Sequence, residues 1–122
     1  NFDSIVAMES RGFLFAPALC YKLNKGLVLV RKPGKLPAAT IEESYALEYG
    51  KNTLQMHSDS LSEKNRVVIF DDVLATGGTA EATAKLVSRS GATIESFSFL
   101  IELSFLNGKQ KLNAPYSSII QY

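Results

Sequence analysis

Residues 67–80 constrain the fold of this chain more than any other stretch. The first four, Val-Val-Ile-Phe, form an apolar, β-branched run that is typical of a strand buried on both faces of a sheet. Asp71 and Asp72 follow at the carboxyl end of this strand, then a turn of small residues, then a helical pattern from about 79 to 90. Strand, turn and helix are half of a βαβ unit, and ligands of open parallel sheets bind at the carboxyl ends of strands.

The turn that follows the two acids has the composition of an anion site. Gly77 and Gly78 carry no side chains, so their backbone N–H groups can curl around a phosphate. The helix N-terminus adds unpaired donors and the positive end of a dipole, and Thr76 and Thr79 add hydroxyls. Carboxylates would repel a phosphate in the same cup, but they accept hydrogen bonds from sugar hydroxyls beside it. The stretch therefore predicts a sugar-phosphate site.

A plainer interpretation stays open on these residues alone. Gly-Gly turns after strands are common, and paired acids at a strand end are often only solvated. The spacing matches neither the Walker loop nor the dinucleotide-binding fingerprint. Further chemistry at the same sheet edge is needed to decide between the two interpretations.

The pattern of the whole chain predicts an α/β fold, in which helices flank a mostly parallel sheet and a flexible hairpin arm projects from it. Alternating polar and apolar residues on both sides of Gly50 indicate the hairpin. The expected elements are strands at 4–8, 27–30, 67–70 and 93–103, an edge strand at 116–121, and helices at 13–23 and 79–90. Met8, Val30 and Asp71 would then end strands on one edge of the sheet.

Length and composition favour one domain, residues 1–122. Because residue 1 is Asn and a strand pattern begins almost at once, we expect this domain to be N-terminally incomplete. A formal net charge of +1 gives no case for nucleic acid or a membrane as partner, and no apolar run approaches membrane-spanning length. Cys20, the only cysteine, is expected to be a core thiol, and its isolation favours a cytoplasmic location.

Two other strand ends carry basic residues. Arg11 provides a planar, permanently charged fork suited to a phosphate, unless it pairs with Glu9 or another acid. Arg31, Lys32 and Lys35 flank a proline-rigid bend, for which a solvated basic loop is the alternative. Because both loops would open on the same edge as the phosphate cup, together they imply a ligand with more than one phosphate group.

The strand, the two acids and Thr-Gly-Gly-Thr resemble the phosphoribosyl pyrophosphate (PRPP) motif of type I phosphoribosyltransferases. Glu-Ser-Arg-Gly-Phe, Arg-Lys-Pro-Gly-Lys-Leu-Pro and Tyr-Ala-Leu-Glu-Tyr-Gly accompany it, and together these motifs resemble the adenine phosphoribosyltransferases over essentially the whole chain. The resemblance implies transfer of the 5-phosphoribosyl group from PRPP to adenine, giving AMP and pyrophosphate in purine salvage. It also implies Mg²⁺ held mainly by PRPP and water, a homodimer, and a base-binding N-terminal helical segment that we expect to be missing here.

The resemblance also implies a role for each candidate site residue. Asp71 and Asp72 would bind the ribose hydroxyls, Leu74 would lie near the base, and Glu48 on the arm would be the catalytic acid/base. The 5′-phosphate would be bound by Ala75, Thr76, Gly77, Gly78 and Thr79. The pyrophosphate would be bound by Ser10, Arg11, Arg31, Lys32 and Lys35. No side chain would hold the metal directly.

Two other functions stay open. One is the same chemistry on another base, such as xanthine or orotate, and the other is a PRPP-sensing regulatory domain on the same fold. From the residues alone, Glu48 is a plain surface glutamate, and Tyr45 and Tyr49 are packing residues. His57, the only histidine, is expected at the surface, because nothing nearby completes a catalytic arrangement with it.

Overall fold

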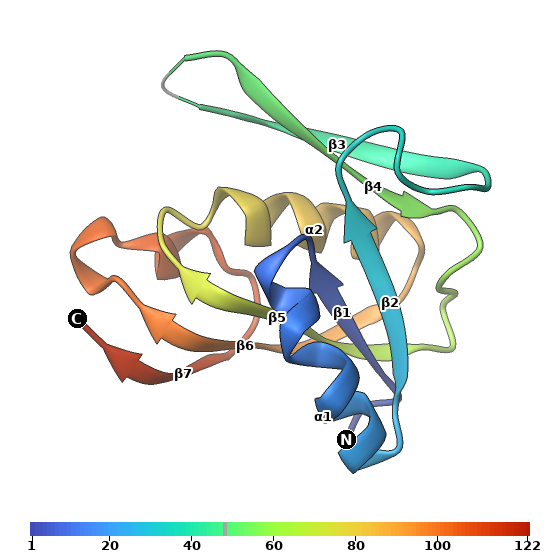
Figure 1. Cartoon of the computed structure of the whole chain (residues 1–122), viewed down its shortest axis with the longest axis horizontal. Helices are drawn as coiled ribbons and strands as arrows, with labels where there is room; N and C mark the ends of the chain where they lie inside the picture. The colour runs from blue at the N-terminus through green and yellow to red at the C-terminus, as the bar shows by residue number, and fades with distance from the viewer. Residues whose placement is uncertain (48) are drawn as a thin grey trace.

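The computed structural model describes residues 1–47 and 49–122, which form one seven-stranded sheet in the order β3-β4-β2-β1-β5-β6-β7 (Figure 1). The neighbouring strands in the part β2-β1-β5-β6-β7 are parallel. β4 is antiparallel to both of its neighbours, β2 and β3. The strands are β1 (Ser4–Met8), β2 (Gly26–Arg31), β3 (Thr40–Ala46), β4 (Lys51–His57), β5 (Arg66–Leu74), β6 (Thr93–Glu102) and β7 (Tyr116–Gln121). The predicted α/β fold with a mostly parallel sheet is confirmed, and β7 is the predicted edge strand.

Helices α1 (Ala16–Leu23) and α2 (Gly78–Arg89) lie against opposite faces of the sheet, because successive residues of β1 point to opposite sides. Ile5 and Ala7 pack with Ala16 and Cys20 of α1. The larger core includes the other β1 residues, Val6 and Met8, and the buried face of α2. Cys20 is the core thiol expected from the sequence, and its Sγ donates to the carbonyl of Gly26 at 3.3 Å.

The helix predicted for 13–23 starts later than expected. Arg11–Leu14 forms a 3₁₀ turn, η1, and α1 begins only at Ala16, with Pro17 in its first turn. A helix that ran from residue 13 would place the Pro17 ring against the carbonyl of Phe13, which proline does not tolerate. The predicted end is confirmed, since Asn24 takes a left-handed φ of 56° there.

Strand β5 is longer than its apolar run suggests. It continues to Leu74, and Asp71 pairs with Phe99 of β6, so the two acids lie inside the strand. The prediction that the acids follow the strand is therefore wrong. The ten-residue β6 offers a continuous ladder of backbone partners, and this outweighs the weak strand preference of aspartate.

Strands β3 and β4 form the predicted hairpin, with a register from Thr40↔His57 to Ala46↔Lys51. The hairpin crosses the sheet at the top of Figure 1, next to α2. Position 48 lies outside the described residues, and the mobility of this arm stays a prediction. In the described part of the chain, no helix is both long and apolar enough to cross a bilayer.

Candidate active site

In the loop between β5 and α2, residues 75–79, the backbone requires glycine at position 77 for two reasons, its conformation and the closeness of another loop. Gly77 caps α2 with a φ of +88°, a conformation that favours glycine. A Cβ on Gly77 would lie 2.6 Å from the carbonyl oxygen of Gly108, at the start of the 3₁₀ turn η3 (Gly108–Lys111). The phosphate loop therefore rests directly on the backbone of a second loop.

This contact adds Gly108 to the site, a residue that sequence reasoning treated only as part of a turn. A Cβ on Gly108 would collide with the carbonyl oxygen of Ala75. The only signal in the sequence was a glycine in an Asn-Gly-Lys turn, which does not reveal its spatial neighbour. Asn107 just before it takes a left-handed φ of 54° and links η3 to the 3₁₀ turn η2 (Ser104–Leu106).

A cavity of about 160 Å³ opens at the carboxyl end of β5 and the N-terminus of α2. It brings together Arg11, Asp71, Leu74 and the whole phosphate loop, so most of the predicted ribose and phosphate residues share one site. Leu74 is buried at its wall, and its carbonyl accepts a hydrogen bond from Leu103 N at 2.9 Å. The cavity is completed by Val73, Ala80 and Phe99, which the sequence analysis did not single out.

The first N–H groups of a helix have no partner within the helix, so the N-terminus of α2 offers donors to an anion in this cavity. Glu81 N already donates to Gly77 O at 2.9 Å, which leaves the N–H groups before it for a ligand. Thr79 and the exposed Thr76 add hydroxyl donors at the same rim. The loop at residues 75–79 therefore offers an anion both backbone and hydroxyl donors.

The two acids are half-buried, in contrast to the exposed strand end that the sequence suggested. Asp71 Oδ1 accepts from Asp72 N at 2.9 Å. Burial, followed by the side-chain hydrogen bond with Asp72 and the charge of Asp72, raises the pKa of Asp71 to about 7. The hydrogen bond from the backbone N–H of Asp72 and the Arg11 guanidinium only partly offset this. Asp71 is therefore poised to exchange a proton near neutral pH.

Arg11 pairs with the second acid, since its Nε lies 3.0 Å from Asp72 Oδ2. The alternative that Arg11 pairs with an acid is thus confirmed, but the partner is Asp72 and not Glu9. The Arg11 side chain is 71 % exposed while that of Asp72 is 15 % exposed, so the guanidinium can turn toward a ligand without leaving a deep pocket. Ser10, just before it, is exposed in the turn.

The basic loop after β2 is organised by Glu9, whose carboxylate lies between its cations. Glu9 Oε1 accepts from Arg31 Nε at 3.0 Å and from Lys32 N at 3.2 Å, and Lys35 Nζ lies 3.9 Å from Oε2. Burial opposes the charge of Glu9, but these donors and cations hold its pKa below the ordinary value. The Arg31 guanidinium also lies 5.7 Å from the centre of the Phe13 ring.

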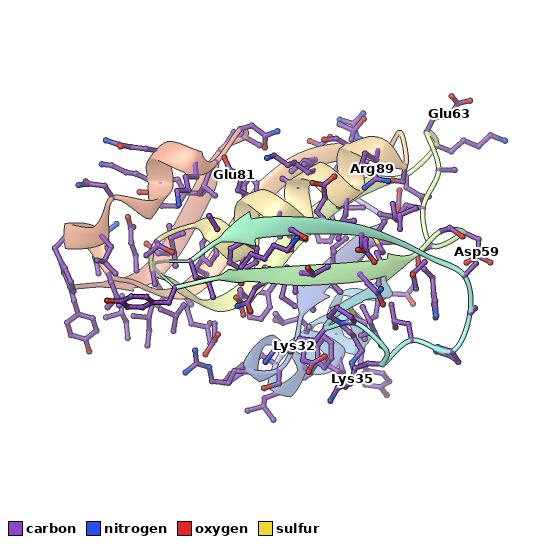
Figure 2. The ribbon with its side chains drawn as sticks, turned by 90° about the horizontal axis from the view of Figure 1, so that it is seen from above. Lys32, Lys35, Asp59, Glu63, Glu81 and Arg89 are labelled. Atoms are coloured by element: carbon purple, nitrogen blue, oxygen red, sulfur yellow. The ribbon has the colours of Figure 1, made fainter. Side chains whose placement is uncertain are left out.

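These contacts separate the predicted pyrophosphate residues into two groups. Arg11 lines the cavity, whereas Arg31, Lys32 and Lys35 surround Glu9 at the neighbouring strand end and do not line it. Lys32 and Lys35 lie together on one side of the hairpin in Figure 2. The prediction that both basic loops open on the same sheet edge agrees with the parallel pairing of β1, β2 and β5.

The remaining predicted residues divide between the arm and the surface. The catalytic assignment of Glu48 lies outside the described residues and stays a prediction. His57 Nε2 accepts from Ala38 N at 3.4 Å, in keeping with a structural role. Among residues 1–47 and 49–122, no group of three or more His, Cys, Asp and Glu side chains could hold a metal ion.

The fold and this site define a phosphoribosyltransferase. The family model described as "Phosphoribosyl transferase domain" matches residues 1–114, and the chain belongs to that family. Within the family its similarity is to adenine phosphoribosyltransferases. That of Thermosipho africanus is 60% identical over 112 residues, which are 92% of this chain and 66% of the relative, and that of Roseiflexus is 52% identical over 98% of this chain and 70% of the relative.

Solved structures give the same result. A crystal structure of adenine phosphoribosyltransferase from Thermoanaerobacter pseudethanolicus covers 100% of this chain with a TM-score of 0.97 and 52% identity, and the chain covers 72% of it. The Trypanosoma brucei enzyme, in complex with AMP, pyrophosphate and ribose-5-phosphate, has a TM-score of 0.91 and 34% identity over 98% of this chain and 56% of that chain. The chain spans about two thirds of the length of the curated relatives it matches.

Proposed function

We propose that this chain carries the PRPP-binding core of an enzyme that transfers the 5-phosphoribosyl group from PRPP to adenine. A ring nitrogen of adenine forms a bond to C1 of the ribose, the bond from C1 to pyrophosphate breaks, and the base loses one proton, giving AMP and pyrophosphate. The single observation that carries the proposal is the cavity in which Arg11 and Asp71 face the phosphate loop.

We assign the parts of PRPP to different parts of this site. The cup at residues 75–79 holds the 5′-phosphate, because it combines free helix N–H groups with hydroxyl donors. Asp71 and Asp72 accept hydrogen bonds from the ribose hydroxyls, next to the cup and outside it. Arg11 turns from Asp72 to the pyrophosphate, which Lys32 and Lys35 approach from the neighbouring loop, with Ser10 close by.

Arg31 takes a different role from the one predicted for it. Its guanidinium is committed to Glu9 and to the Phe13 ring. We therefore propose that Arg31 positions the basic loop, whereas the two lysines supply the charge that meets the ligand. The assignments of Glu48 as acid/base and of Leu74 beside the base are supported by the resemblance of the sequence motifs.

Mg²⁺ fits this site only as an ion that arrives with PRPP. Asp71 and Asp72 provide the oxygen donors that Mg²⁺ prefers, but two carboxylates do not complete an octahedral shell. PRPP oxygens and water would supply the rest, and the bound ion would neutralise part of the pyrophosphate charge. A homodimer and a cytoplasmic location belong to the same proposal; the resemblance implies the first and the lone cysteine favours the second.

A test of the proposal is the formation of AMP from adenine and PRPP by the protein in the presence of Mg²⁺, with hypoxanthine, xanthine and orotate as competing bases. Preferential turnover of adenine supports it. Binding of PRPP without turnover of any base would instead favour the PRPP-sensing domain, and preference for another base would correct the substrate. Lys64→Gln is a suitable control variant, because Lys64 is exposed just before β5, at the opposite end of that strand from the cup.

A further inference from the structure

Tyr45 connects the hairpin to the phosphate cup. Its hydroxyl oxygen lies 3.0 Å from Thr79 Oγ1, and its ring lies over Gly78, where a Cβ would come within 2.9 Å of the ring carbon Cδ2. Tyr45 belongs to β3 and pairs directly with Asn52 of β4. Two residues of the cup, Gly78 and Thr79, are therefore in contact with a side chain from a distant part of the sequence.

The Tyr45 hydroxyl has hydrogen-bond partners on two sides, Asn52 and Thr79. Asn52 Nδ2 donates to the Tyr45 hydroxyl oxygen at 3.3 Å. In the Tyr45–Thr79 pair either hydroxyl can be the donor. With Asn52 already donating to the phenol oxygen, an anion that accepts from Thr79 favours the arrangement in which Tyr45 donates its single proton to Thr79 Oγ1. The Thr79 hydroxyl then accepts from Tyr45, and its own single proton is free for a third partner. Because Thr79 lines the cavity, that partner is an anion in the cup.

The hairpin is also fixed to α2 at a second point, so the position of Tyr45 does not depend on Thr79 alone. Arg89 Nη1 donates to the Glu42 carbonyl at 2.6 Å and to Glu43 Oε2 at 3.0 Å. Figure 2 shows the hairpin running alongside α2, with Arg89 on the side away from Lys35. Strand β3 is therefore attached at both ends of the helix that forms the cup.

We propose that Asn52, Tyr45 and Thr79 form an oriented hydrogen-bond relay that directs the Thr79 hydroxyl proton at the bound 5′-phosphate. This rests on the proposed function only in assigning the cup to that phosphate. Each donor in the chain polarises the next, so the relay strengthens the final O–H···phosphate bond beyond that of an isolated threonine. Tyr45 and Asn52 are positioning residues that act through Thr79.

The first test is the affinity for ribose 5-phosphate, measured by calorimetric titration. Tyr45→Phe keeps the ring over Gly78 and removes the hydroxyl, so it is expected to weaken binding about two- to tenfold. Ser44→Ala is the matched control, because Ser44 Oγ and Thr53 Oγ1 form a 2.7 Å hydroxyl pair across the same hairpin. Equal affinities of wild type and Tyr45→Phe would overturn the relay.

A second test reverses the direction of the relay. Asn52→Asp replaces the donor by an acceptor that captures the Tyr45 proton, so Thr79 must donate to Tyr45 and not to the phosphate. This variant is expected to bind ribose 5-phosphate more weakly than Tyr45→Phe. Lys51→Gln controls for the change of one charge unit, since Lys51 is the exposed neighbour on the same strand. An Asn52→Asp variant that binds as well as Lys51→Gln contradicts the proposal.

The double variant separates a relay from a structural effect. If Asn52→Asp acts through the phenol proton, adding Tyr45→Phe should restore affinity to the level of Tyr45→Phe alone, whereas independent structural damage would add. Additive losses overturn the relay and leave the proposed enzyme intact. If the variants follow the expected order of ribose 5-phosphate affinities while the wild type fails to turn over adenine, that combination would support the relay and refute the enzyme.

Discussion

Arg11 and Asp72 form an ion pair, with Arg11 Nε 3.0 Å from Asp72 Oδ2, although the two residues belong to different parts of the proposed PRPP site. In this pair each charge offsets the other. PRPP would replace it by two new sets of contacts, pyrophosphate for the arginine and ribose hydroxyls for the aspartate. In the proposed function, PRPP binding is therefore an exchange of ion-pair partners and not the filling of a preformed set of free charges.

The exchange predicts a selective effect of Arg11→Ala. Loss of a hydrogen bond to a charged group costs about 1.5–3 kcal/mol, so PRPP affinity should fall roughly tenfold to a hundredfold. Ribose 5-phosphate lacks the pyrophosphate, and its affinity should change little. Calorimetric titration of both ligands checks this, with Arg11→Lys as the control that keeps the charge but loses the fork. Equal losses for both ligands would mean that Arg11 acts through the general field or on stability.

Asp71 predicts a pH dependence of stability. Its pKa in the folded protein is about 7, chiefly because of burial, compared with 3.8 in the reference state. The folded state then binds more protons than the unfolded state between these values, so the free energy of unfolding falls as pH rises through this window. Asp71→Asn removes the effect. Urea unfolding at about pH 5 and about pH 8 checks this. The free energy of unfolding of Asp71→Asn, relative to that of wild type, should be higher at about pH 8 than at about pH 5.

The burial of Glu9 predicts that its loss lowers the free energy of unfolding more than the loss of a more exposed carboxylate does. Its side chain is 9 % exposed and serves Arg31, Lys32 and Lys35, so Glu9→Gln should lower the free energy of unfolding by about 1–3 kcal/mol and weaken PRPP binding. Glu43→Gln, which breaks a more exposed pair with Arg89, should cost about 0–1 kcal/mol. Comparable unfolding curves for the two variants would show that Glu9 does not organise the loop.

Gly108 predicts damage to the cup from a residue outside it. A Cβ there meets the carbonyl of Ala75, which is backbone and cannot rotate away, so Gly108→Ala should displace the phosphate loop. Ribose 5-phosphate affinity and the melting temperature should both fall. Gly34→Ala is the comparison, because Gly34 has a φ of +83° but nothing within 4 Å, so it pays only the backbone strain. Unchanged ribose 5-phosphate binding in Gly108→Ala would disprove the support role.

Glu48 predicts a change in turnover without a change in PRPP affinity. Glu48→Gln keeps the size of the side chain but cannot take a proton from adenine, so the turnover number should fall about 10²–10⁴-fold. Steady-state kinetics and PRPP titration together check this. A variant with a normal turnover number would leave Glu48 without an acid/base role.

Local patterns predicted most of the fold, because alternation and apolar runs depend on neighbours in the sequence. The bounds of β1 and β7 agree with the predicted ranges, and the turn at residues 75–79 was predicted from its glycines, its threonines and the helical pattern that follows. The length of β5 was missed because Asp71 is held in the strand by backbone partners on β6. Propensity carries no information on such partners.

Contacts between distant residues account for the other differences at the site. Nothing in the sequence specifies that Asp72 is the partner of Arg11, or that Gly108 supports Gly77. Tyr45 was assigned to ordinary packing, and its ring does pack on Gly78, but its hydroxyl contact becomes visible only when β3 lies along α2. Tertiary packing decides which distant residues meet, and a single sequence carries no local pattern for these contacts.

The narrow junction between the hairpin and the parallel sheet has a consequence for local unfolding. β4 pairs with β2 at Val30↔Met56 and Arg31↔Gln55, whereas β3 and β4 pair along their whole length. Because the hairpin also buries Leu54 and Met56 in the core and is bonded to α2, we expect it to open only as one cooperative unit that breaks all of these contacts together. Amide hydrogen exchange in β3 and β4 should then report this partial opening, with ribose 5-phosphate slowing exchange there by closing the seam from the Tyr45 end.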